Sequence, residues 1–468
     1  MLDKPLRVFA PCGFTWNNKG DAALLIALDQ AISGHFKVAE LTFTSFTPGL
    51  DEPRYGRTVL AMPLTHRGLT GRIIHRILRR TPLKPITPYL VAAQVLAFLA
   101  YLKIVAALWR ISPALGRLVS LPSTRKVAHA VASSDICVAV PGGYLLGPSR
   151  YDDYWLYHLV TISVALFFRK PVVLYSCSIG PFVGLNRPFA RWLLPRVELI
   201  IAREEETVEK LLSLGVEPDR IRVAPDAVFG LEVAQPLQEE APETWDMVTT
   251  VRQPLIGVSV RDFHFPGSDD PKKRWSAYVE EIRRCTHFVT KELDGSVFFV
   301  PQCIKNGGRD VEVAREIVSG LEDATNVHVI DADLSPGGLA ALYGMFDMLV
   351  GTRMHANILA LTQGTPVVAI AYEHKTTGIM QMLALGEWCI DIRKVEGRLA
   401  LLVARAWQER DRLRDTISRN VPALKQQARE VPKMLEPFLA AWRSIEQDTR
   451  GGLDTEGVAR PIRGRQAR

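Results

Sequence analysis

Three side chains suited to binding an anion and moving a proton stand close together in the sequence. Arg353 and His355 follow the apolar run MLVG and open the helical pattern HANILALTQG, and Lys375 follows the apolar run PVVAIAY. In open parallel sheets, ligands bind beyond the carboxyl ends of the strands, where helix amino termini offer unpaired N–H groups. We therefore predict that Arg353 and Lys375 hold an anion at one sheet edge and that His355 manages a proton there.

Two more arginines stand at equivalent turns. Arg203 lies between the apolar run ELIIA and the helical pattern EEETVEKL, and Arg261 follows the run IGVSV. Arg203 either faces a cleft between two domains or pairs with the glutamates beside it. Asp21 and Asp226 are candidates for the base that activates an acceptor hydroxyl.

The elements that must position these residues alternate between short apolar runs and longer helical patterns, as in parallel sheets covered by helices. The chain has 468 residues, more than the roughly 250 to 300 at which a single core stops growing. We expect an α/β fold with two Rossmann-like domains that face each other across a cleft, as in the GT-B architecture. The first domain is expected at 1–235, a linker at 236–250, the second domain at 251–446 and a disordered basic tail at 447–468.

The apolar runs give the expected strands. In the first domain they lie at 6–10, 38–44, 136–140, 172–176, 199–202 and 221–224. In the second domain they are the runs PLIGVSV, SVFFVPQ, VHVIDA, DMLVGT and PVVAIAY. The helical patterns after Gly397 are expected to close the second domain.

A basic and apolar helical insert at about 66–120 departs from this alternation. Residues 67–80 carry five arginines, and 90–109 are apolar except for Gln94 and Lys103. The apolar stretch is long enough to span a bilayer, but a single crossing would separate strands that should share one sheet. Interfacial docking through 66–110 and ordinary packing of buried helices are the alternatives.

The composition limits the partners and the compartment. Lys plus Arg number 57 against 50 Asp plus Glu, a net charge of +7 that favours anionic partners but does not indicate a nucleic-acid binder. The six cysteines show no CxxC pair, and HExxH and GxxxxGK[ST] motifs are absent, so we expect no metal and no nucleotide phosphate loop. The amino terminus does not read as a secretory signal. We expect a cytoplasmic protein, with peripheral attachment at the inner face of the cell membrane as the alternative.

Several segments together resemble one family. The segment GTRMHANILALTQGTPVVAIAYEHKTTG resembles the signature of the polysaccharide pyruvyl transferases, and NNKGDAALL, SIGP, AREEETVEKL and APDAVF resemble further blocks of that family in the same order. Where the family often has a run of glycines, this chain has PGGYLLGPS. The resemblance implies transfer of pyruvate from phosphoenolpyruvate, as co-substrate and without a cofactor, onto two hydroxyls of a sugar. The products would be a cyclic ketal and phosphate.

The resemblance also assigns roles to residues. It makes the second domain the donor-binding side and the first domain the acceptor side. His355 would be catalytic, and the donor would bind to Arg353, Lys375, Arg203 and Arg261. The acceptor or its loops would involve the following residues: Asn18, Gly20, Asp21, Gly142, Gly143 and Tyr144.

Two other functions share the expected architecture. A GT-B glycosyltransferase would use a sugar nucleotide instead of phosphoenolpyruvate, and a glycan-assembly protein could keep the fold without catalysis. The sequence leaves open the oligomeric state and whether the sugar acceptor is nucleotide-linked or lipid-linked.

Overall fold

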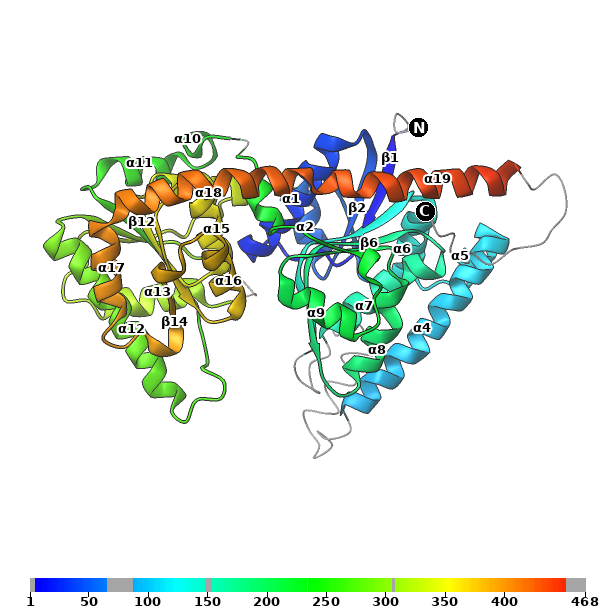
Figure 1. Cartoon of the computed structure of the whole chain (residues 1–468), viewed down its shortest axis with the longest axis horizontal. Coiled ribbons are helices and arrows are strands. Elements are labelled where there is room, and N and C mark those ends of the chain that lie inside the picture. The colour runs from blue at the N-terminus through cyan, green and yellow to red at the C-terminus, as the bar shows by residue number, and fades with distance from the viewer. Residues whose placement is uncertain (1–4, 65–86, 148–153, 234, 305–307, 452–468) are drawn as a thin grey trace.

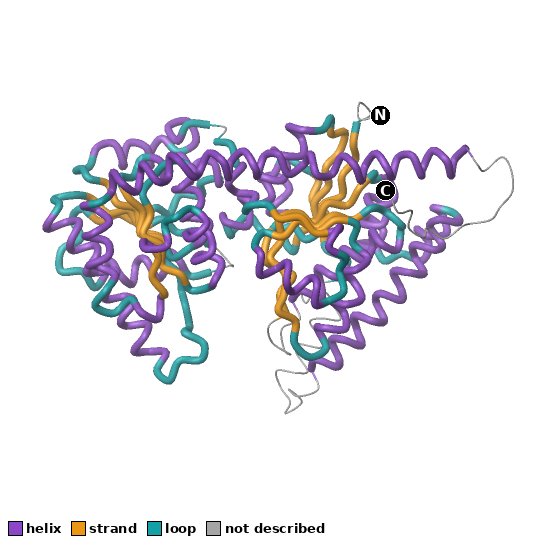
Figure 2. The backbone as a smooth tube through the Cα atoms, viewed as in Figure 1, coloured by secondary structure: helices purple, strands orange, loops and turns teal. Residues whose placement is uncertain are grey.

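A computed structural model describes residues 5–64, 87–147, 154–233, 235–304 and 308–451. Two α/β domains lie side by side, each with a parallel sheet at its centre and helices around it (Figures 1 and 2). The expected fold class is confirmed. The strands at the middle of each sheet are runs of Val, Ile and Leu that are buried on both faces, as parallel sheets require.

The first sheet has eight strands in the order β3-β2-β1-β4-β6-β7-β8, with β5 beside β6. Its strands are β1 (Leu6–Ala10), β2 (Val38–Ser45), β3 (Thr58–Ala61), β4 (Ile136–Ala139), β5 (Gly142–Gly147), β6 (Val172–Phe182), β7 (Leu199–Ala202) and β8 (Ile221–Val223). The six expected strands are present, and the sequence pattern missed β3 and β5.

The second sheet has six strands in the order β11-β10-β9-β12-β13-β14. They are β9 (Leu255–Ser259), β10 (Ser296–Phe299), β11 (Val327–Val329), β12 (Met348–Gly351), β13 (Val367–Ala371) and β14 (Cys389–Asp391). All pairs in this sheet are parallel. The five expected strands are present, and β14 was missed.

Helices cover both sheets. Those of the first domain are α1 (Lys19–His35), α2 (Pro48–Tyr55), α4 (Thr87–Ile111), α5 (Pro113–Val119), α6 (Pro122–Ser133), α7 (Tyr154–Phe167), α8 (Asn186–Leu193) and α9 (Glu205–Ser213). Those of the second are α12 (Pro271–His287), α13 (Asp310–Ser319), α14 (Pro336–Gly344), α15 (Met354–Thr362), α16 (His374–Met382) and α17 (Leu399–Gln408). In the insert, 66–86 lie outside the described residues, and the rest forms α4 and α5.

The segment 236–250 between the domains is helical. It forms α10 (Leu237–Glu240) and α11 (Pro242–Thr250). Glu240 accepts a hydrogen bond from the Ser335 hydroxyl at 2.8 Å, at the start of α14. The segment is therefore packed against the second domain.

The carboxy-terminal helices correct one expectation. After α17, helix α18 (Arg410–Glu430) crosses from the second domain toward the first, and α19 (Glu436–Gly451) lies over the first domain (Figure 1). Glu436 pairs with His35 of α1 at 2.6 Å. These helices do not simply close the second domain, because α19 buries Leu439 on the first. Helix α19 also extends beyond residue 447, and 452–468 lie outside the described residues.

Candidate active site

A cavity of about 350 Å³ opens between the domains, where the carboxyl ends of the two sheets face each other. The first domain contributes Phe14, Asn18, Gly20, Asp21, Leu24, Gly143, Tyr144, Leu146 and Arg203. The second contributes Arg261, Gln302, Arg353, Met354, His355, Tyr372, Glu373, Lys375 and Thr376. The structure thus brings the predicted site residues together at this cavity with two exceptions. Gly142 lies behind the wall, where any Cβ would meet Phe14 and Leu24. Asp226 pairs with Arg203 and lines a neighbouring cavity instead.

Arg353 is fixed from behind by a carboxylate that the sequence pattern did not single out. Asp310, at the start of α13, is fully buried and accepts from Arg353 Nε at 3.0 Å and from Nη2. The same carboxylate accepts from the backbone N–H groups of Gln302 and Cys303. A guanidinium has five N–H donors, so the Asp310 fork leaves three for a ligand. Asp310 therefore sets the orientation of Arg353 toward the cavity.

His355, in the first turn of α15, lies between the two domains. Its Nδ1 packs so close to Gly20 that a Cβ at that glycine would lie 2.3 Å away. Its Nε2 is buried, lies 3.8 Å from Asp226 Oδ2 and has no hydrogen-bond partner among the described residues. That distance is too long for a direct hydrogen bond, so the Asp226 carboxylate faces the imidazole across a short gap at the edge of the cavity.

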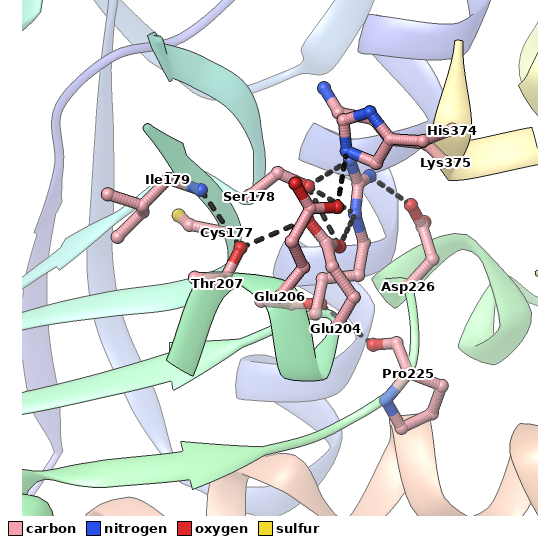
Figure 3. A network of polar contacts seen from close by, with 12 residues as sticks. Cys177, Ser178, Ile179, Glu204, Glu206, Thr207, Pro225, Asp226, His374 and Lys375 are labelled. Carbon is pink, nitrogen blue, oxygen red and sulfur yellow. Dashed lines mark hydrogen bonds and ion pairs between the residues drawn. The ribbon is translucent and has the colours of Figure 1, made fainter. Parts of the chain in front are cut away.

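Arg203 belongs to a buried polar network at the ends of β6 and β7. Its Nε and Nη2 donate to the Ser178 hydroxyl at 3.0 and 2.6 Å, Nε lies 3.4 Å from Glu204, and Nη1 pairs with Asp226. Figure 3 shows Ser178, Glu204 and Asp226 gathered in this network, with Lys375 entering from the second domain. Both alternatives for Arg203 are therefore met, because it pairs with Glu204 and also lines the cavity.

The neighbours of Asp226 keep its carboxyl group ionised. Burial acts to raise the pKa of this carboxyl, but Arg203 and His355 outweigh burial and hold its pKa well below the ordinary value. An acid with so low a pKa is a poor base near neutral pH. Asp226 therefore fits the role of orienting Arg203 and His355 better than that of activating a hydroxyl.

Lys375 and Arg261 complete the cationic wall. The Lys375 side chain is 9% exposed, and its Nζ lies 4.0 Å from Glu373. Burial, and then the charge of Arg203, lowers the pKa of Lys375. A Cβ at Gly143 would lie 2.4 Å from Nζ, so this glycine makes room for the ammonium group. Arg261 stacks on Tyr372, with Cζ 3.9 Å from the ring centre.

The loop before α1 is held by the second domain. Lys19 N donates to Gln302 O at 2.9 Å, Ile304 N donates to Asn17 O at 3.1 Å, and Asn18 pairs with Cys303 in an antiparallel bridge. Asn18 also caps α1 by accepting from Gly20 N, and its amide donates to Asp21 at 2.6 Å. Burial raises the pKa of Asp21, which makes it a stronger base than an exposed aspartate.

A second cavity of about 620 Å³ adjoins the first. Arg203 and Lys375 line both cavities and stand between them. The second cavity is also lined by Glu204, Glu205, Glu206, Asp226, Phe229, His374 and Met382, among others. His374 of α16 pairs with Glu206 of α9 at 3.3 Å, so both domains also form this cavity.

Comparison with known families identifies the chain. The family model described as Polysaccharide pyruvyl transferase matches residues 18–374, more than half of the chain. The chain belongs to the polysaccharide pyruvyl transferase family. The match begins at Asn18, spans both sheets, includes Arg353 and His355, and ends one residue before Lys375.

One curated relative has a name that points to exopolysaccharide synthesis. The Amylovoran biosynthesis protein AmsJ of Erwinia amylovora is 22% identical to this chain over 285 residues. The alignment covers 56% of this chain and 62% of AmsJ. The chain therefore spans less than two thirds of that relative's length.

Solved structures share the two-domain architecture of this chain. Anabaena HepE in complex with UDP matches with a TM-score of 0.52 at 14% identity, covering 93% of this chain and 100% of HepE. A glycosyltransferase from Rickettsia africae matches with a TM-score of 0.54 at 12% identity, covering 95% and 100%. The UDP-GlcNAc 2-epimerase of Neisseria meningitidis gives 0.53 at 10% identity, covering 92% and 99%. At such identities the likeness shows the GT-B-like fold alone.

Proposed function

We propose that the protein transfers pyruvate from phosphoenolpyruvate to two hydroxyls of one sugar, forming a cyclic ketal and releasing phosphate. The observation that carries the proposal is the convergence of Arg203, Arg261, Arg353 and Lys375 around His355 at one interdomain cavity. Phosphoenolpyruvate carries a carboxylate and a phosphate. Guanidinium and ammonium groups are the usual partners of both.

His355 is the group that moves the proton. Protonation of the methylene carbon of phosphoenolpyruvate leaves a cationic centre at C2, and a sugar hydroxyl attacks that centre and loses its own proton. The C2–O bond to phosphate then breaks, and phosphate leaves with the bonding pair. The second hydroxyl attacks C2 and loses its proton, which closes the ketal. His355 Nε2 is buried and lies 3.8 Å from Asp226, so a carboxylate faces the ring assigned to the proton transfer.

The acceptor fits the second cavity beside the donor. Its hydroxyls would meet the carboxylates of Glu204 and Glu206, which accept hydrogen bonds from neutral sugars. Because Arg203 and Lys375 line both cavities, a hydroxyl in the second would lie near a donor in the first. Asp21, on the opposite wall of the first cavity, is the candidate base for the attacking hydroxyl.

Two measurements test the proposal. Phosphoenolpyruvate should raise the melting temperature of the wild-type protein and of His355→Gln, because the cations that hold the donor are intact, whereas Arg353→Gln should lose most of the shift. In a strain lacking the protein, the wild-type chain should restore a pyruvate ketal on surface polysaccharide, detected by mass spectrometry. His355→Gln should reduce activity by about 10² to 10⁴-fold.

Specific outcomes would overturn the proposal. Stabilisation by a sugar nucleotide and not by phosphoenolpyruvate would favour a GT-B glycosyltransferase. Absence of binding to either, with polysaccharide unchanged in the deletion strain, would favour a glycan-assembly protein without catalysis. Near wild-type ketal formation by His355→Gln would remove His355 from the proton transfer.

A further inference from the structure

Helix α4 has two apolar faces, and only one of them is covered by protein. The inner face, which includes Val91, Val95, Leu102 and Val105, is buried in the core of the first domain. The outer face exposes large apolar side chains, namely Tyr89 (64%), Leu90 (42%), Leu96 (57%), Ile104 (58%) and Ile111 (74%). A solvated helix normally presents polar residues on its outer face. The side chains on the outer face of α4 are therefore suited to contact with an apolar partner.

The exposed apolar surface continues onto α5. Leu115, Leu118, Val119 and Leu121 are 44%, 79%, 41% and 54% exposed. The Tyr101 hydroxyl of α4 ties the two helices together, because it donates to Val119 O at the end of α5 at 3.4 Å and accepts from Leu121 N, just after α5, at 2.7 Å. We define the α4–α5 face as the following exposed residues: Tyr89, Leu90, Leu96, Ile104, Ile111, Leu115, Leu118, Val119 and Leu121. Contiguous apolar patches of this kind mark interaction sites.

An apolar groove runs beside the α4–α5 face. It has a volume of about 520 Å³ and lies between α4 and the segment of α7 and α8. Its lining is Ala92, Leu96, Leu99, Ala100, Lys103, Phe167, Leu185, Pro188, Phe189 and Trp192. Lys103 is the single charged residue in this lining, and a lysine can lie along an apolar surface with its ammonium group in the polar layer. The groove could hold a hydrocarbon chain.

The charge around this face has one sign. The sequence contains no Asp or Glu from 53 to 134 or from 154 to 197. From residue 87 to 134 and from 154 to 197, the exposed lysines and arginines are Lys103, Arg110, Arg117, Arg125, Lys126, Arg169, Arg187, Arg191 and Arg196. Arg110 and Arg169 lie close enough that burial and then the Arg169 charge lower the pKa of Arg110. A basic rim around an apolar surface is complementary to anionic lipid headgroups above acyl chains.

The sheet order excludes a transmembrane course for α4. The helix is long and apolar enough to cross a bilayer. However, β1–β3 precede it, β4–β8 follow it, and β1 pairs directly with β4, with Val8 opposite Ile136. A crossing at α4 would place these paired strands on opposite sides of the membrane. Helix α4 can therefore lie on a bilayer but cannot span one in this fold.

We propose that the α4–α5 face docks the protein onto an anionic phospholipid bilayer, with the helices parallel to the membrane surface. Helix α4 lies on the outer flank of the first domain, away from the second domain (Figure 1). Docking there leaves the interdomain cavities open. The exposed leucines and isoleucines enter the boundary between headgroups and acyl chains, and the arginines contact the headgroups. The groove beside α4 receives a chain from the same bilayer.

Vesicle flotation tests the docking. The full chain is mixed with vesicles of phosphatidylcholine alone or of phosphatidylcholine with phosphatidylglycerol. We expect binding to the anionic vesicles, weakening as salt screens the arginines. The triple variant Leu96→Gln, Ile104→Gln, Leu118→Gln should bind at least about tenfold more weakly, because it removes apolar area from the contact. Glutamine keeps the helix and adds no charge.

A matched control distinguishes the loss of the α4–α5 face from the loss of an exposed apolar side chain elsewhere in the protein. Leu401 of α17 is 72% exposed and lies in the second domain, so Leu401→Gln should leave vesicle binding unchanged. Circular dichroism and phosphoenolpyruvate-induced stabilisation should match wild type for both variants, which makes this test independent of the proposed function. Absence of vesicle binding, or equal binding by the triple variant, would overturn the proposal. Self-association that the triple variant abolishes, without vesicle binding, would instead assign the face to a second copy.

Discussion

At the scale of single residues, two glycines determine where the chemical groups of the cavity can lie. Gly20 leaves space for the ring of His355, and Gly143 leaves space for the ammonium group of Lys375. In each case a glycine of the first domain meets a side chain of the second. The absence of a Cβ therefore fixes how closely the two halves of the site approach.

Gly20→Ala should impair catalysis without unfolding the protein. The added Cβ would lie 2.3 Å from His355 Nδ1 and would displace the ring. A shift of about 1 Å can reduce the rate by about 100-fold, so we expect a loss of that order in the rate of phosphate release. Gly34→Ala is the control in the same helix, because its Cβ would meet nothing within 4 Å. Equal activity of the two variants would contradict the role assigned to Gly20.

The buried pair of Asp226 and Arg203 makes stability depend on pH. The folded-state pKa of Asp226 lies well below the value of about 3.9 for an unfolded chain. The folded protein thus binds fewer protons, and the stability from ionised Asp226 is complete above about pH 4 and is lost as the pH falls further. Asp226→Asn should lose about 3 kcal/mol of unfolding free energy at pH 7, and the difference should shrink in acid.

Urea unfolding between pH 3 and pH 7 measures this difference. Asp331→Asn is the control, since Asp331 is 72% exposed, lies 3.5 Å from Arg315 and should contribute little. If Asp226→Asn were as stable as wild type at pH 7, the pair would not have the electrostatic role described here.

The residues that the sequence could predict are those that directly follow a strand. Arg203, Arg261, Arg353 and Lys375 were predicted because charged residues after buried strands must lie at the sheet edge. Asp310 was missed, since it begins a helix eleven residues beyond the end of β10 and only the folded loop brings it to Arg353. The part played by the glycines was also missed, because sequence does not show which side chain faces a given backbone atom.

At the scale of elements, β6 and β7 are joined by an unusual carboxylate. Glu198, just before β7, accepts a hydrogen bond from Val172 N at the start of β6 at 2.7 Å. Burial raises its pKa to about 6, more than the backbone hydrogen bonds lower it. The first sheet therefore has a carboxylate just before β7, that of Glu198, which is protonated more readily than an exposed glutamate.

Glu198→Gln should stabilise the protein in neutral and alkaline solution. A raised folded-state pKa means that the contribution of Glu198 is complete below about pH 4.3 and is lost as the pH rises through about 6. Glutamine keeps an acceptor for Val172 N without the buried charge. Urea unfolding at pH 8 should show a gain of about 1 to 2 kcal/mol, which disappears near pH 4. The exposed Glu217→Gln is the control, and a gain independent of pH would contradict the explanation.

Elements were predictable where burial on both faces leaves a continuous apolar run. The strands at the centre of both sheets have such runs. Strand β5 was missed because its sequence, GGYLLG, is rich in glycine and suggests a loop. The edge strands β3 and β14 are short and only partly buried, so their patterns are weak.

At the scale of the whole molecule, the domains are joined by a charged cluster besides the backbone pairing near Asn18. Asp333 of the second domain accepts from Trp16 Nε1 at 3.1 Å, from Arg54 at 2.7 Å and from Lys19. The Lys19 side chain is fully buried. Asp333 therefore neutralises a lysine that the interface removes from water.

Asp333→Asn should loosen the interface between the domains. Lys19 would keep its buried ammonium group but lose the charge opposite it, and we expect a loss of about 1 to 3 kcal/mol in unfolding free energy. The Michaelis constant for phosphoenolpyruvate should rise, because both domains line the cavity. Asp331→Asn, two residues away and 72% exposed, is the control. Unchanged stability and kinetics in Asp333→Asn would show that the backbone pairing alone holds the interface.

The packing of the two domains and of the carboxy-terminal helices was the feature least predictable from the sequence. Helical periodicity indicated that the carboxy-terminal helices bury one face, but not which domain they cover. Contacts such as that of Glu436 with His35, 401 residues apart in the chain, come from tertiary structure alone. The GT-B-like arrangement was predicted because two series of strands and helices were visible in the sequence.

The return of α19 to the first domain has a consequence for biosynthesis on the ribosome. The surface of α1 is covered by residues that follow β8 by roughly 200 positions. At about 5 to 20 residues per second, the nascent first domain waits roughly 10 to 40 s for its last helix. During that interval the apolar surface under Leu439 stays open to chaperones, so the first domain completes its fold only after the second has been translated.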